Sequence, residues 1–313
     1  MSSRVPGAWD TEYHAPVLAD EILKLFEGAR TVLDCTLGGG GHTAALLAMG
    51  ATVTAIDRDP AAIETSLKRL ASDAASGRFH AILGNFSEVD TLLTDPAQRF
   101  GAILADLGVS SHQLDDEARG FSFREGAMLD MRMGDSDAGA DDLLNTADES
   151  ELATIFRDYG DEPKARRLAR EVVRRRDNRA FSTSDDFVGA IRAVLGPRSG
   201  SGDFARLFQS LRIAVNGELT GLTSALPALR DRLEPGGTLA VISYHSGEDR
   251  ITKHAMREWS LDCICPPKQP MCTCRGAALG KLVTRKAVPA SEAETQRNPR
   301  ARSARLRAWR KKA

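Results

Sequence analysis

The sequence predicts an α/β fold in which a doubly wound, parallel sheet carries an inserted helical domain. Strand-like apolar runs alternate with helical runs at both ends of the 313-residue chain, and this alternation is typical of parallel sheets covered on both faces. Between the two ends lie about ninety residues without strand-like runs, too many for a loop. We therefore predict a discontinuous sheet domain, 1–114 with 204–313, and an inserted helical domain, 115–203.

The first half of the sheet domain contains four strand-like runs and two helical ones. The predicted strands lie within the runs 31–37, 52–59, 79–89 and 100–111, each of which begins with a short apolar stretch. Helices are predicted at 42–50, which Gly50 can cap, and at 60–72, where Pro60 suits the first turn. This order of elements is that of repeated strand–helix units.

The insert and the end of the sheet domain follow from the same patterns. In the insert, apolar residues recur at helical spacing in three runs, 149–160, 164–176 and 184–196. A helix at 218–233, a turn at 234–237 and a strand at 238–246 then follow. The last strand is expected to join the same sheet as the first four.

Composition and charge are typical of a soluble globular protein. The chain is 42% hydrophobic and 27% charged, with a formal net charge of −1. No apolar run approaches the ~18 residues that span a bilayer, and the N-terminal residues lack the apolar core of a signal peptide, so a cytoplasmic location is expected. Two basic blocks, 164–176 and the run from Arg297, are either phosphate-contacting surfaces or solvated faces.

Four consecutive glycines, Gly38–Gly41, separate the first predicted strand from the first helix. Glycine loses more conformational freedom on folding than any other residue, so close approach of a ligand to the backbone would explain the run. In doubly wound sheets this turn binds cofactors, and an acid after the second strand, here Asp57, accepts hydrogen bonds from ribose hydroxyls. Gly39, Gly41 and Ala44 fit a G-x-G-x-x-A frame. S-adenosylmethionine (SAM), a dinucleotide and a turn without a ligand all remain open.

Residues after the other strands favour SAM over a dinucleotide. Asp34 lies just before the glycines, and Asn85 with Phe86 follows the third strand, where an adenine would be contacted. Asp106 follows the fourth strand, where a methyl acceptor would lie. A dehydrogenase more commonly adds a separate substrate half, whereas here one sheet is split by a helical insert.

A series of longer motifs runs in order along most of the chain. They are HAPVL, TLGGGGHT, AIDRDP, ADLGVSSHQLDDEARGFSF, LDMRM, FQSLRIAVNGEL, ISYHSGEDRI and NPRARSARLR. Together they resemble the motifs of the bacterial ribosomal RNA small subunit methyltransferase H family, also called MraW. The resemblance implies a class I SAM-dependent methyltransferase fold, Rossmann-like, with a helical domain inserted for substrate recognition. It implies methyl transfer to the exocyclic N4 of a specific cytidine in the decoding region of 16S rRNA. The helical insert and the basic run from Arg297 give two separate surfaces, more than a short single strand requires, so the 30S subunit is the expected partner.

The resemblance also implies which residues bind SAM. The positions carried over are Gly40, Gly41, His42, Asp57, Phe86, Asp106 and Gln113. The glycines would let the methionine and ribose parts of SAM approach the backbone. Asp57 would accept hydrogen bonds from the ribose diol, and Phe86 would pack near the adenine. Asp106 and Gln113 would contact the polar end of the cofactor. His42 could instead only cap its helix, and Gln113 could only bond its own loop.

The sequence does not single out a catalytic group. A cytosine amine is a poor nucleophile, but the methyl group of SAM is already activated, so positioning can supply much of the acceleration. The candidates by position are Asp106, Ser110, Ser111 and His245. Cys35 lacks an obvious partner for attack on a ring carbon and is predicted to be a small core residue.

Three further questions stay open at this level. The family pattern SFHSLEDR reads SYHSGEDR here, and the departures Tyr244 and Gly247 leave the role of that loop uncertain. A SAM-dependent RNA-binding or assembly factor without catalysis is the alternative to an enzyme. The oligomeric state, including a homodimer, is not determined.

The other four cysteines are clustered. Cys263, Cys265, Cys272 and Cys274 form a C-x-C-x6-C-x-C pattern in a proline-rich run. In a reducing compartment such a pattern could close a tetrahedral zinc site, although the usual spacing is C-x2-C. Free thiols and disulfides are the alternatives, so no metal ligand is assigned.

Overall fold

A computed structural model describes residues 16–110, 116, 119–134, 138–266, 269 and 271–313. Its internal contacts divide the chain into two compact units. We call Met1–Gly108 with Leu219–Ala313 the sheet unit and Val109–Glu218 the helical unit. The helical unit is longer at both ends than the predicted insert, 115–203.

The sheet unit is built on five parallel strands. They are β1 (Thr31–Asp34), β2 (Thr52–Asp57), β3 (Phe79–Leu83), β4 (Phe100–Asp106) and β5 (Leu233–Ser243). Their order across the sheet, β3-β2-β1-β4-β5, is that of doubly wound folds, so ligands are expected beyond the carboxyl ends of the strands. The predicted turn at 234–237 is instead part of β5, where the register with β4 shifts between Phe100 and Ala102.

Three antiparallel strands complete the sheet. Strand β8 (Arg305–Lys311) pairs with β5, and both β6 (Gly280–Leu282) and β7 (Val288–Pro289) pair with β8. The basic run from Arg297 is therefore not a separate tail. It contains the end of α14 (Glu292–Arg297), a short 3-10 helix, η3 (Pro299–Ser303), and a strand whose Leu306, Ala308 and Trp309 are buried.

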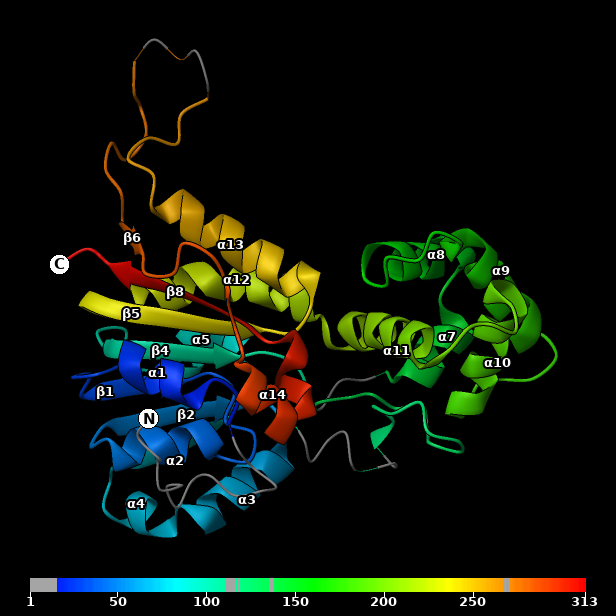
Figure 1. The fold of residues 1–313 in the computed structure, drawn as a ribbon, viewed down its shortest axis with the longest axis horizontal. Helices are drawn as coiled ribbons and strands as arrows, with labels where there is room; N and C mark the ends of the chain where they lie inside the picture. The colour runs from blue at the N-terminus through cyan, green and yellow to red at the C-terminus, as the bar shows by residue number, and fades with distance from the viewer. Residues whose placement is uncertain (1–15, 111–115, 117–118, 135–137, 267–268, 270) are drawn as a thin grey trace. The chain divides into compact units, whose positions relative to one another are not determined.

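Helices flank the sheet in the ribbon of Figure 1. Alternate residues of the strands fill two cores, one on each face of the sheet. Val32 and Leu104 enter one core, and their neighbours Leu33 and Ile103 enter the other, as the two-residue period of a strand requires. The first core is covered by α1 (Ala19–Leu25), α2 (Gly41–Ala48), α3 (Pro60–Arg69) and α4 (Ala71–Ala75). The second is covered by η1 (Phe86–Glu88), α5 (Val89–Leu92), α12 (Glu218–Asp231) and α13 (Ser246–Trp259).

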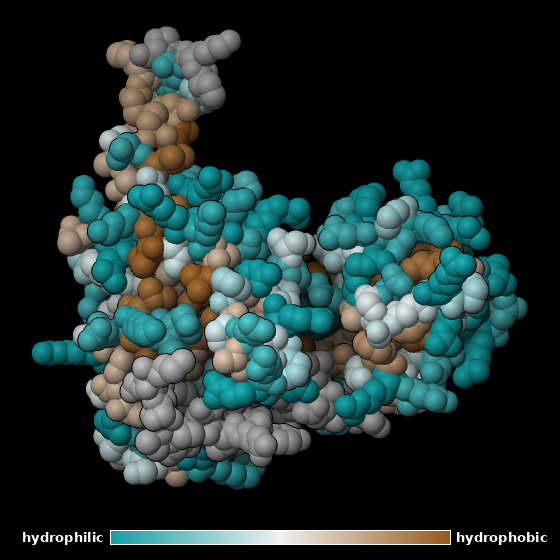
Figure 2. Space-filling model, viewed as in Figure 1, coloured by the Kyte–Doolittle hydropathy of each residue, from teal (hydrophilic) through white to brown (hydrophobic). Residues whose placement is uncertain are grey.

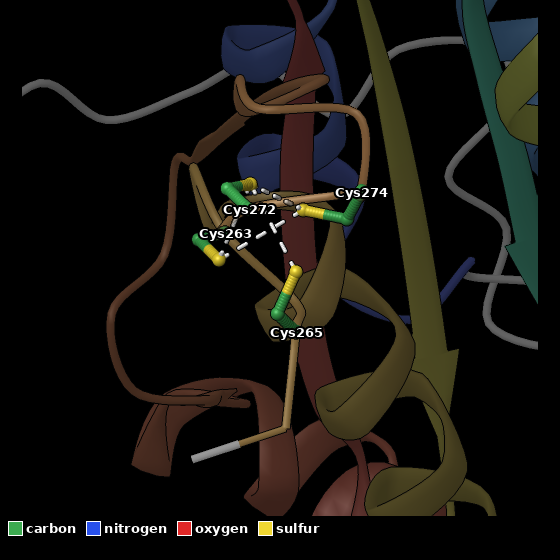
Figure 3. A group of neighbouring side chains, drawn as sticks. All are labelled: Cys263, Cys265, Cys272 and Cys274. Atoms are coloured by element: carbon green, nitrogen blue, oxygen red, sulfur yellow. Dashed lines mark hydrogen bonds between the residues drawn. The ribbon is translucent and has the colours of Figure 1, made fainter. Parts of the chain in front are cut away.

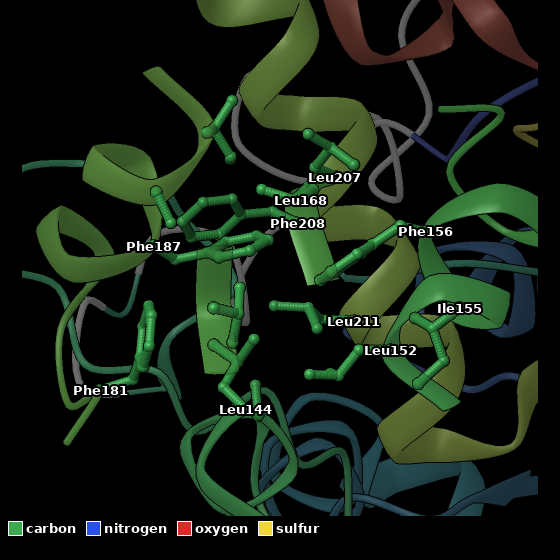
Figure 4. Close-up of a cluster of buried hydrophobic side chains, with 14 of the residues drawn as sticks. Leu144, Leu152, Ile155, Phe156, Leu168, Phe181, Phe187, Leu207, Phe208 and Leu211 are labelled. Atoms are coloured by element: carbon green, nitrogen blue, oxygen red, sulfur yellow. The ribbon is translucent and has the colours of Figure 1, made fainter. Parts of the chain in front are cut away.

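The helical unit has its own aromatic core (Figure 4). Its helices are α7 (Ala140–Thr146), α8 (Glu149–Asp158), α9 (Ala165–Arg176), α10 (Ser184–Leu195) and α11 (Ser201–Asn216). The Phe187 ring lies 5.7 Å from that of Phe156 and 5.3 Å from that of Phe208. Helix α11 contributes Phe204 and Leu207 to this core, which explains why the unit extends beyond the predicted boundary at residue 203.

The basic run 164–176 forms helix α9, and some of its cations contact groups within the unit. Its apolar side, which includes Leu168 and Val172, is buried. Glu171 forms ion pairs with both Arg174 and Arg175, and Arg176 donates to the backbone carbonyl of Ala147. This block is therefore partly structural, and only some of its cations remain for a partner.

The segment before α7 brings together two of the sequence motifs, LDMRM and FQSLRIAVNGEL, to which no role was assigned. Asn216 at the end of α11 donates from Nδ2 to the Met131 carbonyl (2.8 Å) and accepts from the Met133 N–H (3.0 Å). Met131 is held at a φ of 61°. Gly120, at φ 72°, brings its Cα so close to this segment that a Cβ would lie 2.5 Å from the Met128 carbonyl oxygen.

The surface of the protein is mostly hydrophilic on the face shown in Figure 2, with hydrophobic residues in small groups. Throughout the described residues, no helix is both long and apolar enough to cross a membrane.

Candidate cofactor site

Three neighbouring parallel strands each end on an aspartate at the same edge of the sheet. Asp34 ends β1, Asp57 ends β2 and Asp106 ends β4. The glycine run and the start of α2 follow directly after β1. This edge is where a doubly wound sheet binds its ligand, and the predicted site residues of the sheet unit lie along it.

The glycine loop is held in place by helix α3. Gly38 and Gly40 have φ angles of 50° and 73°, which favour glycine. Ser66 Oγ donates to the Gly38 carbonyl at 2.9 Å, and Arg69 Nη1 donates to the Gly39 carbonyl at 2.7 Å. A Cβ at residue 40 would lie 3.0 Å from Ser66 Oγ. The loop therefore has a fixed path and little space for side chains.

Asp57 is held by backbone donors on both of its oxygens. Oδ2 accepts from the Gly38 N–H at 2.7 Å, and Oδ1 accepts from the Asp59 N–H at 2.9 Å. Burial raises the pKa of Asp57 to about 6, and the two backbone hydrogen bonds only partly oppose this rise. A carboxylate has about four acceptor positions, so the side chain can still accept hydrogen bonds from a diol.

Asp34 is fully buried and has a structural role. Its carboxylate accepts from the Thr36 N–H at 3.1 Å and from Thr43 Oγ1 at 2.7 Å, which ties the end of β1 to helix α2. Burial raises the pKa of Asp34 above its usual value. Its negative charge acts on the site at a distance rather than by contact with a ligand.

Asp106 lies between two side chains of different elements. Tyr244 donates from its hydroxyl to Asp106 Oδ1 at 2.9 Å, and His42 Nε2 lies 3.4 Å from Oδ2. That nitrogen is buried and makes no hydrogen bond of good geometry to the described residues. Although burial lowers it, the pKa of His42 is raised overall by Asp106 and Asp34. His42 is the second residue of α2, whose N-cap is Gly40, and its buried side chain faces Asp106 at this edge of the sheet.

The remaining predicted contacts have mixed outcomes. Phe86 is half-buried at the carboxyl end of β3 and packs against the core of the sheet unit. Asn85, expected beside an adenine, instead accepts from the Ser87 N–H and caps η1. Gln113 and Ser111 lie outside the described residues, and Ser110 belongs to the helical unit.

The SYHSGEDR motif forms the start of α13. Glu248 Oε2 accepts from the Tyr244 N–H at 2.8 Å, and Glu248 Oε1 lies 3.2 Å from His245 Nε2. The two departures from the family pattern have visible consequences here. Tyr244 supplies the hydroxyl that holds Asp106, and Gly247 leaves room for the His245 ring, which a Cβ would approach to 3.1 Å. The sequence could not reveal either contact.

The donor set fits SAM better than a dinucleotide. SAM carries a sulfonium and an ammonium group, and three aspartates at one sheet edge provide a negative potential for them. The pyrophosphate of a dinucleotide would be repelled by Asp106 beside the start of α2. The remaining acceptor positions of Asp57 offer the hydrogen bonds that a polar ligand requires.

A basic pocket of about 220 Å³ lies elsewhere in the sheet unit, among α13, β8 and the segment after β6. Its cations are Lys253, Arg257, Arg285, Lys286 and Arg307. Asp249 neutralises Arg307, with Oδ1 at 2.6 Å from Nε. The other four cations form no ion pair with any described residue.

Comparisons with known proteins show the family of the chain. Residues 11–312 match the MraW methylase family. The "Ribosomal RNA small subunit methyltransferase H" of Gemmatimonas aurantiaca is 61% identical over 306 residues, 97% of each chain, and that of Myxococcus xanthus is 46% identical over 94% of this chain and 96% of its own. A solved rRNA methylase from Streptococcus thermophilus aligns over 94% of both chains at 12% identity, with a TM-score of 0.42. The chain belongs to the MraW methylase family.

Proposed function

We propose that this protein transfers a methyl group from SAM to the exocyclic N4 of one cytidine in the decoding region of 16S rRNA, within the 30S subunit in the cytoplasm. Membership of the family supports the reaction class. The observation that carries the proposal is the row of Asp34, Asp57 and Asp106 at the edge of the sheet, beside a bare glycine loop.

The roles of the site residues follow from their contacts. Asp57 accepts hydrogen bonds from the ribose hydroxyls, and the Gly38 and Asp59 N–H groups fix the orientation of its carboxylate. Gly40 and Gly41 allow the cofactor to approach the backbone, and Phe86 packs near the adenine. Asp106 holds the polar end of the cofactor, oriented by Tyr244 and balanced by His42.

The chemistry depends on orientation more than on proton transfer. SAM supplies a methyl group that is already activated on a sulfonium. The protein must keep the acceptor amine in line with that group and keep water away from both. Holding the two groups in line lowers the entropic cost of their encounter. Asp106 is held rigidly by the Tyr244 hydroxyl, so it can maintain this alignment without a change of rotamer.

The basic pocket is the part of the sheet unit that suits an RNA backbone. Lys253, Arg257, Arg285 and Lys286 leave about four positive charges unneutralised around one cavity. Phosphate contacts position an RNA, whereas base contacts select the nucleotide. We propose that this pocket binds phosphates of the rRNA while the helical unit contributes to substrate recognition.

Replacement of Lys253, Arg257 and Lys286 by glutamine is expected to weaken RNA association and its salt dependence. Each lost phosphate contact on a duplex should reduce the slope of log K against log salt by about 0.9. SAM affinity should not change. Filter binding of 16S rRNA fragments over a range of salt concentrations measures both quantities.

The matched control removes three exposed cations far from the pocket in sequence, Lys24, Arg30 and Lys68. Because this variant has the same net charge, it separates a local site from a general effect of charge. Equal salt slopes in the two triple variants would contradict the proposed pocket.

The reaction itself is tested with labelled SAM and 30S particles that lack the modification. We expect label in N4-methylcytidine, identified by mass spectrometry of nucleosides, and less label on the same rRNA stripped of protein. Label at carbon 5 or on a ribose hydroxyl would contradict the reaction, and equal labelling of stripped rRNA would contradict the particle preference. Tight binding to 30S without transfer would favour an assembly factor.

A further inference from the structure

Four cysteine side chains converge in the loop between α13 and β6, as Figure 3 shows. Cys263 and Cys265 come from the outgoing arm of this loop, and Cys272 and Cys274 from the returning arm. All four sulfurs lie within 4.8 Å of one another, and none is in a disulfide. We call the described residues of 261–278 the cysteine loop.

The separations between the sulfurs match a tetrahedral metal site. Cys263 and Cys272 are 3.8 Å apart, as are Cys265 and Cys272, and Cys263 and Cys274. The Cys272–Cys274 separation is 3.4 Å. With Zn–S bonds of about 2.3 Å, the edge of a regular tetrahedron of sulfurs is about 3.8 Å. The four thiols thus already surround a space of the correct size.

Backbone donors are arranged around these sulfurs with approximate twofold symmetry. The Ile264 N–H, in the middle of the first C-x-C, donates to Cys274 Sγ at 3.3 Å. The Thr273 N–H, in the middle of the second, donates to Cys265 Sγ at 3.4 Å. Each arm therefore supports the second sulfur of the other. Outer hydrogen bonds of this kind orient metal ligands and stabilise their charge.

Apart from the cysteines, the cysteine loop is held by polar contacts, such as the Ala278 N–H to Asp262 Oδ1 at 3.1 Å, and its described residues include no buried apolar side chain. It stands out from the rest of the sheet unit as a narrow projection (Figures 1 and 2). Its large apolar side chains are exposed, with Ile264 42% and Met271 78% accessible, so they do not form a core. Its base is closed by hydrogen bonds such as Leu279 N–H to the Trp259 carbonyl at 2.8 Å. Ordering the cysteine loop costs conformational entropy, which a metal ion bound by all four thiols would offset.

We propose that Cys263, Cys265, Cys272 and Cys274 bind one structural zinc ion that fixes the cysteine loop. Four sulfur ligands in a tetrahedron select zinc or iron among the common metals, and a site with four protein ligands leaves no open position for catalysis. Each thiol loses its proton when it binds, so the divalent ion removes the repulsion among four adjacent thiolates.

The first test is the metal content of the full chain, purified without chelators from cells grown with added zinc. Elemental analysis should give about one zinc per chain. Cobalt(II) exchanged into the protein should show thiolate charge-transfer bands and the intense visible bands of tetrahedral coordination. Removal of the metal with a strong chelator should increase protease cleavage in the cysteine loop at least about tenfold, because the metal closes the loop.

The second test locates the site. A Cys272→Ser, Cys274→Ser double variant removes one arm and should retain almost no zinc, with an unchanged circular dichroism spectrum because the loop lies outside both cores of the sheet unit. The control is Cys35→Ala, which removes the buried cysteine in the core and should leave the zinc content unchanged.

Three outcomes would overturn the proposal. Zinc far below one per chain after reconstitution, with all four thiols reacting freely, would show that the cluster is a set of free thiols. One iron per chain would contradict the choice of metal. Full zinc content in the double variant would place the metal elsewhere. These measurements do not depend on methyl transfer, so their failure leaves the proposed function untouched.

Discussion

SAM binding by the Asp57→Ala variant is expected to be weaker by about 1 to 3 kcal/mol, or roughly 5- to 150-fold. The substitution leaves the ribose hydroxyls without their charged acceptor. It also frees the Gly38 N–H, which Asp57 Oδ2 holds at 2.7 Å, so the glycine loop loses part of its support. Isothermal titration calorimetry at pH 8 measures the effect, and unchanged affinity would show that Asp57 does not contact the cofactor.

The raised pKa of Asp57, about 6, gives this prediction a pH dependence. A diol donates to the ionised carboxylate, so SAM binding favours the deprotonated form. Below pH 6 binding must expel a proton, and SAM affinity should fall by up to about tenfold per pH unit. Above pH 7 it should be constant. The free energy of unfolding of the SAM-free protein should change with pH in the opposite direction. Its Asp57 contribution is present at low pH, where the group is protonated, and is lost as the pH rises through about 6.

Two variants assign this pH dependence to its source. Asp57→Asn keeps the shape of the side chain but cannot ionise, so its affinity should be lower at pH 8 and should lose the Asp57 contribution to the fall below pH 6. His42 also has a raised pKa and lies at the same edge. If Asp57 is the titrating group, His42→Gln should retain the fall of SAM affinity below pH 6. If His42→Gln abolishes it and Asp57→Asn does not, the titrating group is the histidine.

The parallel part of the fold could be predicted from the sequence because most residues of β1, β2 and β4, and the second half of β5, are apolar and buried. The antiparallel strand β8 could not, because its charges suggest a solvated tail. The pattern of Arg305, Leu306, Arg307 and Ala308 does alternate with the period of a strand, and both Leu306 and Ala308 are buried. Alternation of apolar and charged residues is thus the better signal for a strand. Charge alone is misleading, because the arginines occupy the face of β8 opposite to Leu306 and Ala308.

The acids of the site were predictable, but their partners were not. Asp34, Asp57 and Asp106 each follow an apolar strand, and the carboxyl ends of parallel strands meet at one edge. Tyr244 is 138 residues away from Asp106 in sequence, and its contact depends on the pairing of β5, which ends at Ser243, with β4. Sequence patterns report periodicity within an element, not the side chains that separate elements bring together.

Gly120→Ala is expected to destabilise the helical unit by about 3 kcal/mol or more. The residue has a φ of 72°, which costs an L-amino acid about 1 to 2 kcal/mol. In addition, the new Cβ would lie 2.5 Å from the Met128 carbonyl oxygen and 2.6 Å from the Asp130 nitrogen, both backbone atoms that cannot rotate away. The segment that Asn216 holds must therefore shift. Chemical denaturation followed by fluorescence and circular dichroism measures the loss.

Gly126→Ala is the matched control, because Gly126 lies in the same loop with a φ of 77° but has nothing within 4 Å of the position that a Cβ would take. It should cost only the backbone strain, about 1 to 2 kcal/mol. Since Gly120 belongs to the helical unit, Gly120→Ala should also abolish methylation of 30S particles while leaving SAM affinity within about twofold, if substrate recognition depends on that unit. Equal stability losses in the two variants would show that the close approach at Gly120 carries no energy. If the Gly120→Ala protein loses the expected stability but still methylates 30S particles fully, the helical unit has no part in substrate recognition.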